Sequence, residues 1–114
     1  GFDYKTSLSN ARVGLKYSRE TLAQYEQAVR LGVKENYLGV ELARQKRALA
    51  EQTEASAQED FNLAQEKYNL GAATILDLLN AQESLTQAQT NRVNVLFDYH
   101  IAVAGLENAM GRGR

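Results

Sequence analysis

The sequence predicts an all-α fold, a long antiparallel helical hairpin (coiled coil) with arms of unequal length. Three observations predict it. Apolar or small residues recur every seven residues along most of the chain, as in helices that pack along a seam. The 114 residues include no proline and are dominated by Ala, Gln, Glu, Leu, Lys and Arg, which is typical of long helices. A single short glycine-containing segment, residues 69–74, separates two such runs.

The first arm is predicted as a helix over about residues 8–69. Its main heptad track is made of aliphatic or small residues, with Asn36 as an interruption: Leu8, Leu15, Leu22, Val29, Ala43, Ala50, Ala57 and Ala64. A second track contains Val33, Val40, Phe61 and Tyr68, broken by Arg47 and Glu54, and a partial third contains Leu42, Leu49, Leu63 and Leu70. The alanines allow a partner backbone to approach closely. The breadth of this apolar face indicates more than one neighbouring helix.

The connection is predicted as a tip turn over residues 70–74. Gly71 is suited to the left-handed conformation that ends a helix. Thr74 is a good N-cap for the next helix, and Asp77 favours its positive end. Because the connection is short, the two helices are expected to be antiparallel neighbours.

The second arm is predicted as a helix over about residues 75–110, ended by Gly111. Its apolar residues alternate in steps of three and four, with Arg92 in the one polar slot: Leu78, Ala81, Leu85, Ala88, Val95, Tyr99, Ala102, Leu106 and Ala109. At 1.5 Å per residue the arms would be about 90 Å and 55 Å long. The second arm then returns only to residues 30–34, which leaves Leu8, Leu15 and Leu22 without a partner in this chain. Further segments or copies are therefore expected.

Nothing in the sequence forms a catalytic constellation, so we expect no enzyme, no metal and no cofactor. His100 is the only histidine and there is no cysteine, which excludes a two-histidine metal motif, a thiolate site and a disulfide. The formal net charge of −1 does not favour nucleic acid. The basic cluster Arg44, Lys46 and Arg47 is offset by nearby acidic residues. No apolar run approaches the roughly 20 residues of a membrane span, so no direct membrane insertion by this segment is expected.

Two stretches resemble the TolC-like outer-membrane efflux protein family. Residues 68–89, YNLGAATILDLLNAQESLTQAQ, are similar to its tip motif: Tyr, two residues, Gly, a short polar turn, then Asp-hydrophobic-Leu-x-Ala-Gln. Residues 97–111, FDYHIAVAGLENAMG, are similar to its ending, and residues 57–68 match its approach to the tip. Phe2 and Asp3 resemble the end of a barrel strand that leads into the long helix.

The resemblance implies a trimeric pipe, with a β-barrel in the outer membrane continued by an α-helical barrel across the periplasm. The whole chain, residues 1–114, would be one periplasmic hairpin of the second repeat, without the parent's barrel strands and other repeat. It would line a passive conduit of the Gram-negative cell envelope for multidrug efflux or type I secretion. Its implied partners are a periplasmic adaptor hairpin and, through it, an inner-membrane pump.

Residue by residue, Leu70, Gly71 and Thr74 match the adaptor-facing turn, and Ala72 lies in the same turn. Tyr68 and Asp77 match positions that constrict the pore. A ring of Asp77 from three subunits would favour cations at the mouth. The best-known member has Arg at the position of Ala73 and a second Asp at that of Asn80, so the acidic ring here would be weaker.

Two alternative functions remain open at this point. A periplasmic adaptor hairpin would carry an Arg and a Ser around a Leu at the tip, and this turn has neither. A generic structural or signalling coiled coil, such as a receptor stalk, would self-associate along the seam and would show no special behaviour at Gly71.

Overall fold

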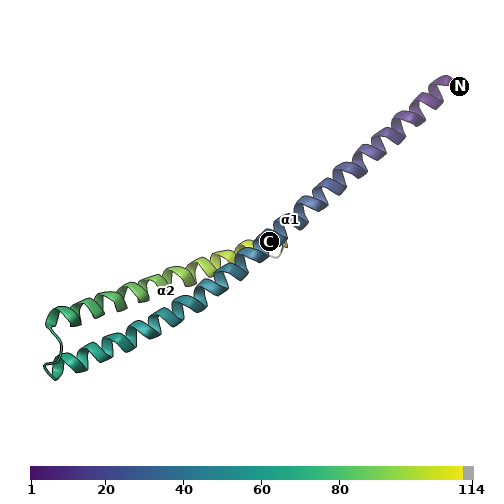
Figure 1. The fold of residues 1–114 in the computed structure, drawn as a ribbon. Helices are drawn as coiled ribbons and strands as arrows, with labels where there is room; N and C mark the ends of the chain where they lie inside the picture. Colours follow the sequence, from purple (N-terminus) through teal and green to yellow (C-terminus); the bar gives the residue numbers. More distant parts are fainter. Residues whose placement is uncertain (112–114) are drawn as a thin grey trace. The chain divides into compact units, whose positions relative to one another are not determined.

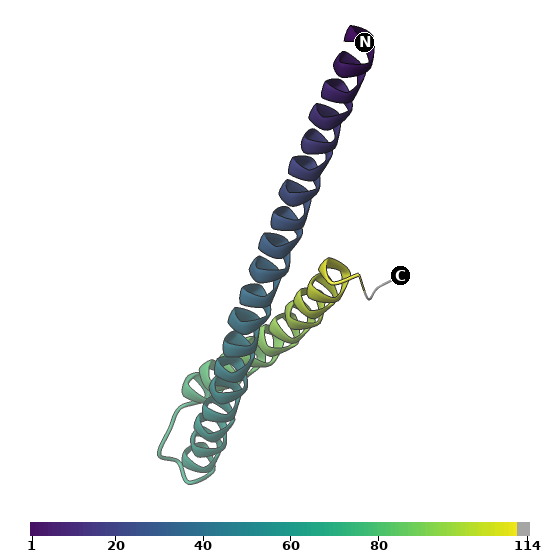
Figure 2. The same ribbon diagram turned by 90° about the vertical axis from the view of Figure 1, so that its right-hand side faces the viewer.

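The computed structural model describes residues 1–111, and these fold as two helices. Helix α1 spans Phe2–Asn69 (68 residues) and α2 spans Ile75–Ala109 (35 residues). After the turn, α2 lies alongside the C-terminal part of α1 and runs in the opposite direction (Figure 1). The second view shows the two arms crossing over each other as they run away from the turn (Figure 2). The predicted all-α hairpin with unequal arms is confirmed.

The start of α1 differs from the expectation. The helix begins at Phe2 rather than at about Leu8, so Phe2 and Asp3 belong to its first turn and not to the end of a strand. The Lys5 amide donates a hydrogen bond to the Gly1 carbonyl at 3.3 Å, which continues the helical pattern to the first residue. Asp3 favours this start because a carboxylate in the first turn meets the positive end of the helix dipole.

The chain divides into two units, Gly1–Glu35 and Asn36–Arg114. The first unit is one stretch of helix whose apolar residues are largely exposed. Leu8, Leu15 and Leu22 expose 41%, 53% and 57% of their surface, in agreement with a face that has no partner in this chain.

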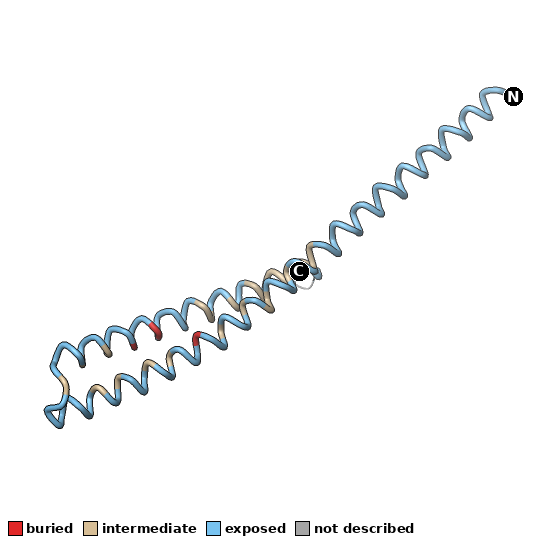
Figure 3. The backbone as a smooth tube through the Cα atoms, viewed as in Figure 1, coloured by how far each residue is buried: buried red, intermediate tan, exposed pale blue. Residues whose placement is uncertain are grey.

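In the second unit the two arms meet along the predicted seam. The α1 residues that are at least half-buried at heptad spacing are Asn36, Val40, Ala43, Arg47, Ala50, Glu54, Ala57, Phe61 and Ala64. On α2 they are Leu78, Ala81, Leu85, Ala88, Val95, Tyr99, Ala102, Leu106 and Ala109. Ala50, Leu85 and Ala88 are buried, and Figure 3 shows the buried stretches facing each other across the hairpin. The small side chains allow this close packing.

Polar residues that interrupt the apolar tracks also lie in the seam, where their side chains contact residues of the opposite arm. The Arg92 guanidinium donates a hydrogen bond to Glu54 Oε2 at 3.0 Å. The Arg47 guanidinium carbon lies 5.2 Å from the centroid of the Tyr99 ring, which is cation–π distance. The interruptions are therefore positions where polar side chains meet across the hairpin.

A second apolar surface of this unit faces solvent. Leu42, Leu49, Leu63 and Leu70, the third track of the sequence, are all exposed by half or more. On α2 the exposed residues Val93, Phe97 and Ile101 are spaced by four and share a face. The broad apolar face expected from the sequence is thus only partly covered by the hairpin itself. Neither described helix contains a stretch apolar enough to cross a membrane.

Candidate functional site at the hairpin tip

The end of α1 is closed by a Schellman motif centred on Gly71. The Gly71 amide donates to the Tyr68 carbonyl at 3.0 Å, and the Ala72 amide donates to the Lys67 carbonyl at 2.7 Å. Gly71 has φ +76°, in the left-handed region that favours glycine. These two bonds satisfy carbonyls that the helix end would otherwise leave unpaired. The chain reverses immediately after them.

The start of α2 is closed by a reciprocal capping box. The Asp77 amide donates to Thr74 Oγ1 at 3.1 Å, and the Thr74 amide donates to Asp77 Oδ2 at 2.9 Å. Thr74 has the extended backbone of an N-cap, with φ −85° and ψ 164°. The tip is therefore held on both sides by hydrogen bonds between neighbouring residues.

The capping box also lowers the pKa of Asp77. The hydrogen bond from the Thr74 amide holds the pKa of the Asp77 carboxyl below its usual value, and the Thr74 hydroxyl and the charge of Lys67 act in the same direction. These groups favour the ionised carboxylate over the protonated acid. Its first role in this chain is to begin α2.

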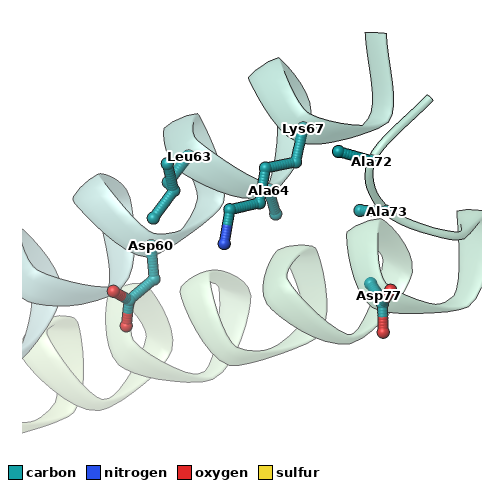
Figure 4. Close-up of a pocket in the computed structure, with 7 residues that line it drawn as sticks. All are labelled: Asp60, Leu63, Ala64, Lys67, Ala72, Ala73 and Asp77. Carbon is teal, nitrogen blue, oxygen red and sulfur yellow. The ribbon is translucent and has the colours of Figure 1, made fainter. Parts of the chain in front are cut away.

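A shallow open groove of about 350 Å³ lies beside the tip, between the end of α1 and the start of α2. Its lining residues are Asp60, Leu63, Ala64, Lys67, Ala72, Ala73 and Asp77. Figure 4 shows the Lys67 side chain extending back over Ala64, with the carboxylates of Asp60 and Asp77 to either side. The groove thus combines small or apolar side chains with one basic and two acidic groups.

The structure places the four predicted tip residues together in the turn. Leu70 is 83% exposed, next to Gly71, and Ala72 and Thr74 are also exposed. These four residues form the apex of the hairpin, as the sequence predicts, although only Ala72 lines the groove.

The predicted pore residues lie on the flanks of the turn. Tyr68 is 40% exposed and accepts the Gly71 hydrogen bond through its backbone. Asn80 is exposed on α2, just after the first turn of that helix. Asp77 is the only one of the three that lines the groove.

Sequence reasoning missed most of the groove. Asp60 and Lys67 are absent from the predicted tip set, although they are seven residues apart and therefore share a face of α1. Combining that spacing with the predicted turn at Gly71 would have placed both beside the tip.

His100 contributes nothing to this site. It is exposed on α2, and its ring meets the Tyr99 ring edge-on with centroids 5.7 Å apart.

Comparison with known families now decides what kind of protein carries this tip. Residues 3–112 match the family described as Outer membrane efflux protein. The chain belongs to this family. Outer membrane efflux proteins are channel components, with a periplasmic tunnel, that work in efflux systems together with adaptors and inner-membrane pumps. Searches of curated proteins and of solved structures gave no significant match.

Proposed function

We propose that this hairpin is a segment of the periplasmic tunnel wall of an outer-membrane efflux or secretion channel, and that its tip docks a periplasmic adaptor hairpin. The observation that carries the proposal is the tip itself. Two hydrogen-bonded caps fix a short turn, and the turn presents the exposed Leu70 beside Gly71. Because the backbone of the turn is already fixed, it presents this apolar side chain to a partner helix without further ordering of the main chain.

The groove beside the tip supports the same proposal. Ala64, Ala72 and Ala73 leave room for side chains of a partner, and Lys67 with Asp60 and Asp77 offers charge of both signs at its edge. Apolar contact at the centre with polar groups at the rim is the usual anatomy of a protein interface.

The second part of the proposal concerns the channel aperture. In a trimer, Asp77, flanked by Tyr68 and Asn80, would place three carboxylates at the mouth. The exposure of Asp77 at the tip supports this, because an exposed carboxylate is charged at neutral pH. The capping box restricts the role, since Asp77 accepts a hydrogen bond from the same chain and offers the pore only its remaining acceptor capacity.

Docking is tested by photo-crosslinking in cells, with the full-length parent protein carrying a photoreactive residue at Ala72. The expected product joins the tip to the hairpin of an adaptor, identified by mass spectrometry. The matched control carries the same group at Ser84, which is exposed on α2 away from the turn. Capture from Ala72 that equals capture from Ser84, or only of the protein's own copies, would remove the docking role and leave a coiled-coil wall segment.

The aperture is tested separately in the assembled parent channel. Asp77→Asn is expected to lower the preference for cations over anions in planar bilayers, because it removes one charge per subunit at the mouth. The control is Asp60→Asn, which removes the same charge from the groove beside the tip but not from the turn itself. An unchanged ion preference in Asp77→Asn would contradict the aperture assignment and would leave the proposal of adaptor docking unaffected.

A further inference from the structure

The apolar part of the seam specifies the alignment of the two arms only weakly. Alanines recur at heptad spacing on both arms, with Val95 in the place of one of them on α2: Ala43, Ala50, Ala57 and Ala64 on α1, and Ala81, Ala88, Ala102 and Ala109 on α2. Sliding α2 along α1 by one heptad, about 10 Å, brings alanines back to equivalent places. A uniform seam of this kind admits several alignments unless other residues discriminate among them.

The polar contacts of the seam do not repeat in this way. Glu54 pairs with Arg92 at 3.0 Å, and Arg47 lies over the Tyr99 ring at 5.2 Å. The two contacts are one heptad apart on each arm, so both report the same alignment. Within the described seam these residues distinguish one heptad from the next.

Either slip by one heptad would create an unfavourable juxtaposition. A slip in one direction brings Arg92 to the level of Arg47, which places like charges together, and brings Glu54 to the level of the buried Leu85. The opposite slip brings Arg47 to the level of Leu106, a half-buried aliphatic seam residue, and separates Glu54 from Arg92. A charge against an apolar neighbour loses water without gaining a partner.

We propose that Arg47, Glu54 and Arg92 select the register of the hairpin and thereby position the tip. A slip of one heptad moves the point of chain reversal by three or four residues. Gly71 would then leave the turn, and the Thr74 cap would be lost. The three side chains therefore determine which residues form the apex, whatever partner the apex binds.

The selection depends on disfavouring wrong registers more than on attraction in the right one. The Glu54 and Arg92 side chains remain 23% and 48% exposed, and an ion pair that is this accessible to water contributes little by itself. A similar use of polar seam residues to fix register is well attested in coiled coils.

The test measures the effect of the seam on the register independently of the effect of the turn. About seven glycine and serine residues inserted between Ala72 and Ala73 remove the constraint of turn length at little entropic cost. Spin labels at Gln65 and Asn94, both exposed, are offset along the hairpin by about 20 Å, so a slip of one heptad changes their separation by up to about 10 Å. Distances are measured by pulsed electron resonance on the full chain.

With the native seam, the long-turn chain is expected to give one distance, equal to that of the chain with its own turn. Adding Arg47→Ala, Glu54→Ala and Arg92→Ala should introduce further distances. The matched control removes the same charges from exposed positions of α1, through Lys34→Ala, Glu35→Ala and Arg44→Ala, and should keep the single distance. A single native distance in the seam variant, or equal broadening in the control, would overturn the proposal.

Loss of folding is not the expected result, because alanine has the highest helix propensity. Should helical circular dichroism nevertheless fall in the triple variant, Arg92→Ala alone is measured in its place. It removes the like-charge conflict with Arg47 as well as the native pair with Glu54, so at least one additional distance is expected. A single native distance in this variant contradicts register selection.

Discussion

Replacing Gly71 by alanine measures how far the tip depends on a left-handed backbone. A Cβ added at Gly71 would meet nothing within 4 Å, so the cost of Gly71→Ala is conformational and not a clash. Holding an L-residue at φ +76° costs roughly 1–2 kcal/mol. The lower freedom of alanine in the unfolded chain returns about 0.4–1 kcal/mol. We therefore expect a net loss of about 1 kcal/mol, close to a fivefold change in the folding equilibrium constant.

The matched control is Gly39→Ala, the same change inside α1. A Cβ at Gly39 also meets nothing within 4 Å, but the backbone there is helical. This variant should gain up to about 1 kcal/mol from helix propensity. Urea unfolding followed by helical circular dichroism, at one protein concentration, measures both. If the two variants moved the unfolding midpoint in the same direction, the argument that the turn requires positive φ would be wrong.

Four further predictions concern the caps and the seam. Thr74→Ala should cost about 1 kcal/mol in the same assay, because the Asp77 amide loses its acceptor. The pKa of Asp77 is lower in the folded chain than its ordinary value of 3.8, so its carboxylate adds stability above pH 3.8 that is lost as the pH falls through the folded pKa. In a titration of folding stability against pH, Asp77→Asn should therefore flatten the loss of stability at acid pH. Gly105→Ala should raise the urea midpoint less than the same substitution at a helical glycine in open space, because the new Cβ would lie 3.0 Å from Asn36 Oδ1. Ala88→Leu should lose about 1–3 kcal/mol, since it overfills a buried seam position, and thermal unfolding checks this.

The sequence was sufficient for the hairpin because each element has a strong local signal. The heptad of alanines predicted which face of α1 meets α2, and the burial of Ala50 and Ala88 agrees with it. Gly71 and Thr74 predicted both ends of the turn from backbone preference and capping alone. Such signals require only neighbouring residues, so they can be interpreted without knowing the partner helix.

The contacts between the arms could not be obtained in the same way. Arg47 and Glu54 interrupt an apolar track when α1 is considered alone, and their place in the seam follows only once Tyr99 and Arg92 are known to lie opposite. That alignment depends on how many residues the turn uses. The groove was missed for the same reason, because Lys67 and Ala73 come together only after the chain reverses.

Asp77 illustrates the difference between a position and a role. The family resemblance associates it with the aperture, whereas the hydrogen bonds of this chain assign it to the capping box. One carboxylate can serve both purposes, since the cap uses only part of its acceptor capacity. A substitution at this position therefore changes the start of α2 as well as any charge at the mouth, and the acid titration and ion preference must be measured together.

The scarcity of large buried side chains in the seam has a consequence for how the hairpin forms. Ala50, Leu85 and Ala88 are the buried apolar residues among those described, so no single cluster holds the arms together. The contacts are instead spread along the hairpin. The two residues of a contact are farther apart in sequence the farther the contact lies from the turn, as Arg47 with Tyr99 shows when compared with Glu54 and Arg92. Because closing a larger loop costs more chain entropy, we expect association to begin at the turn and proceed pair by pair toward the far end. Mutational analysis of folding rates should then give high φ-values beside the turn and low ones near Gly105.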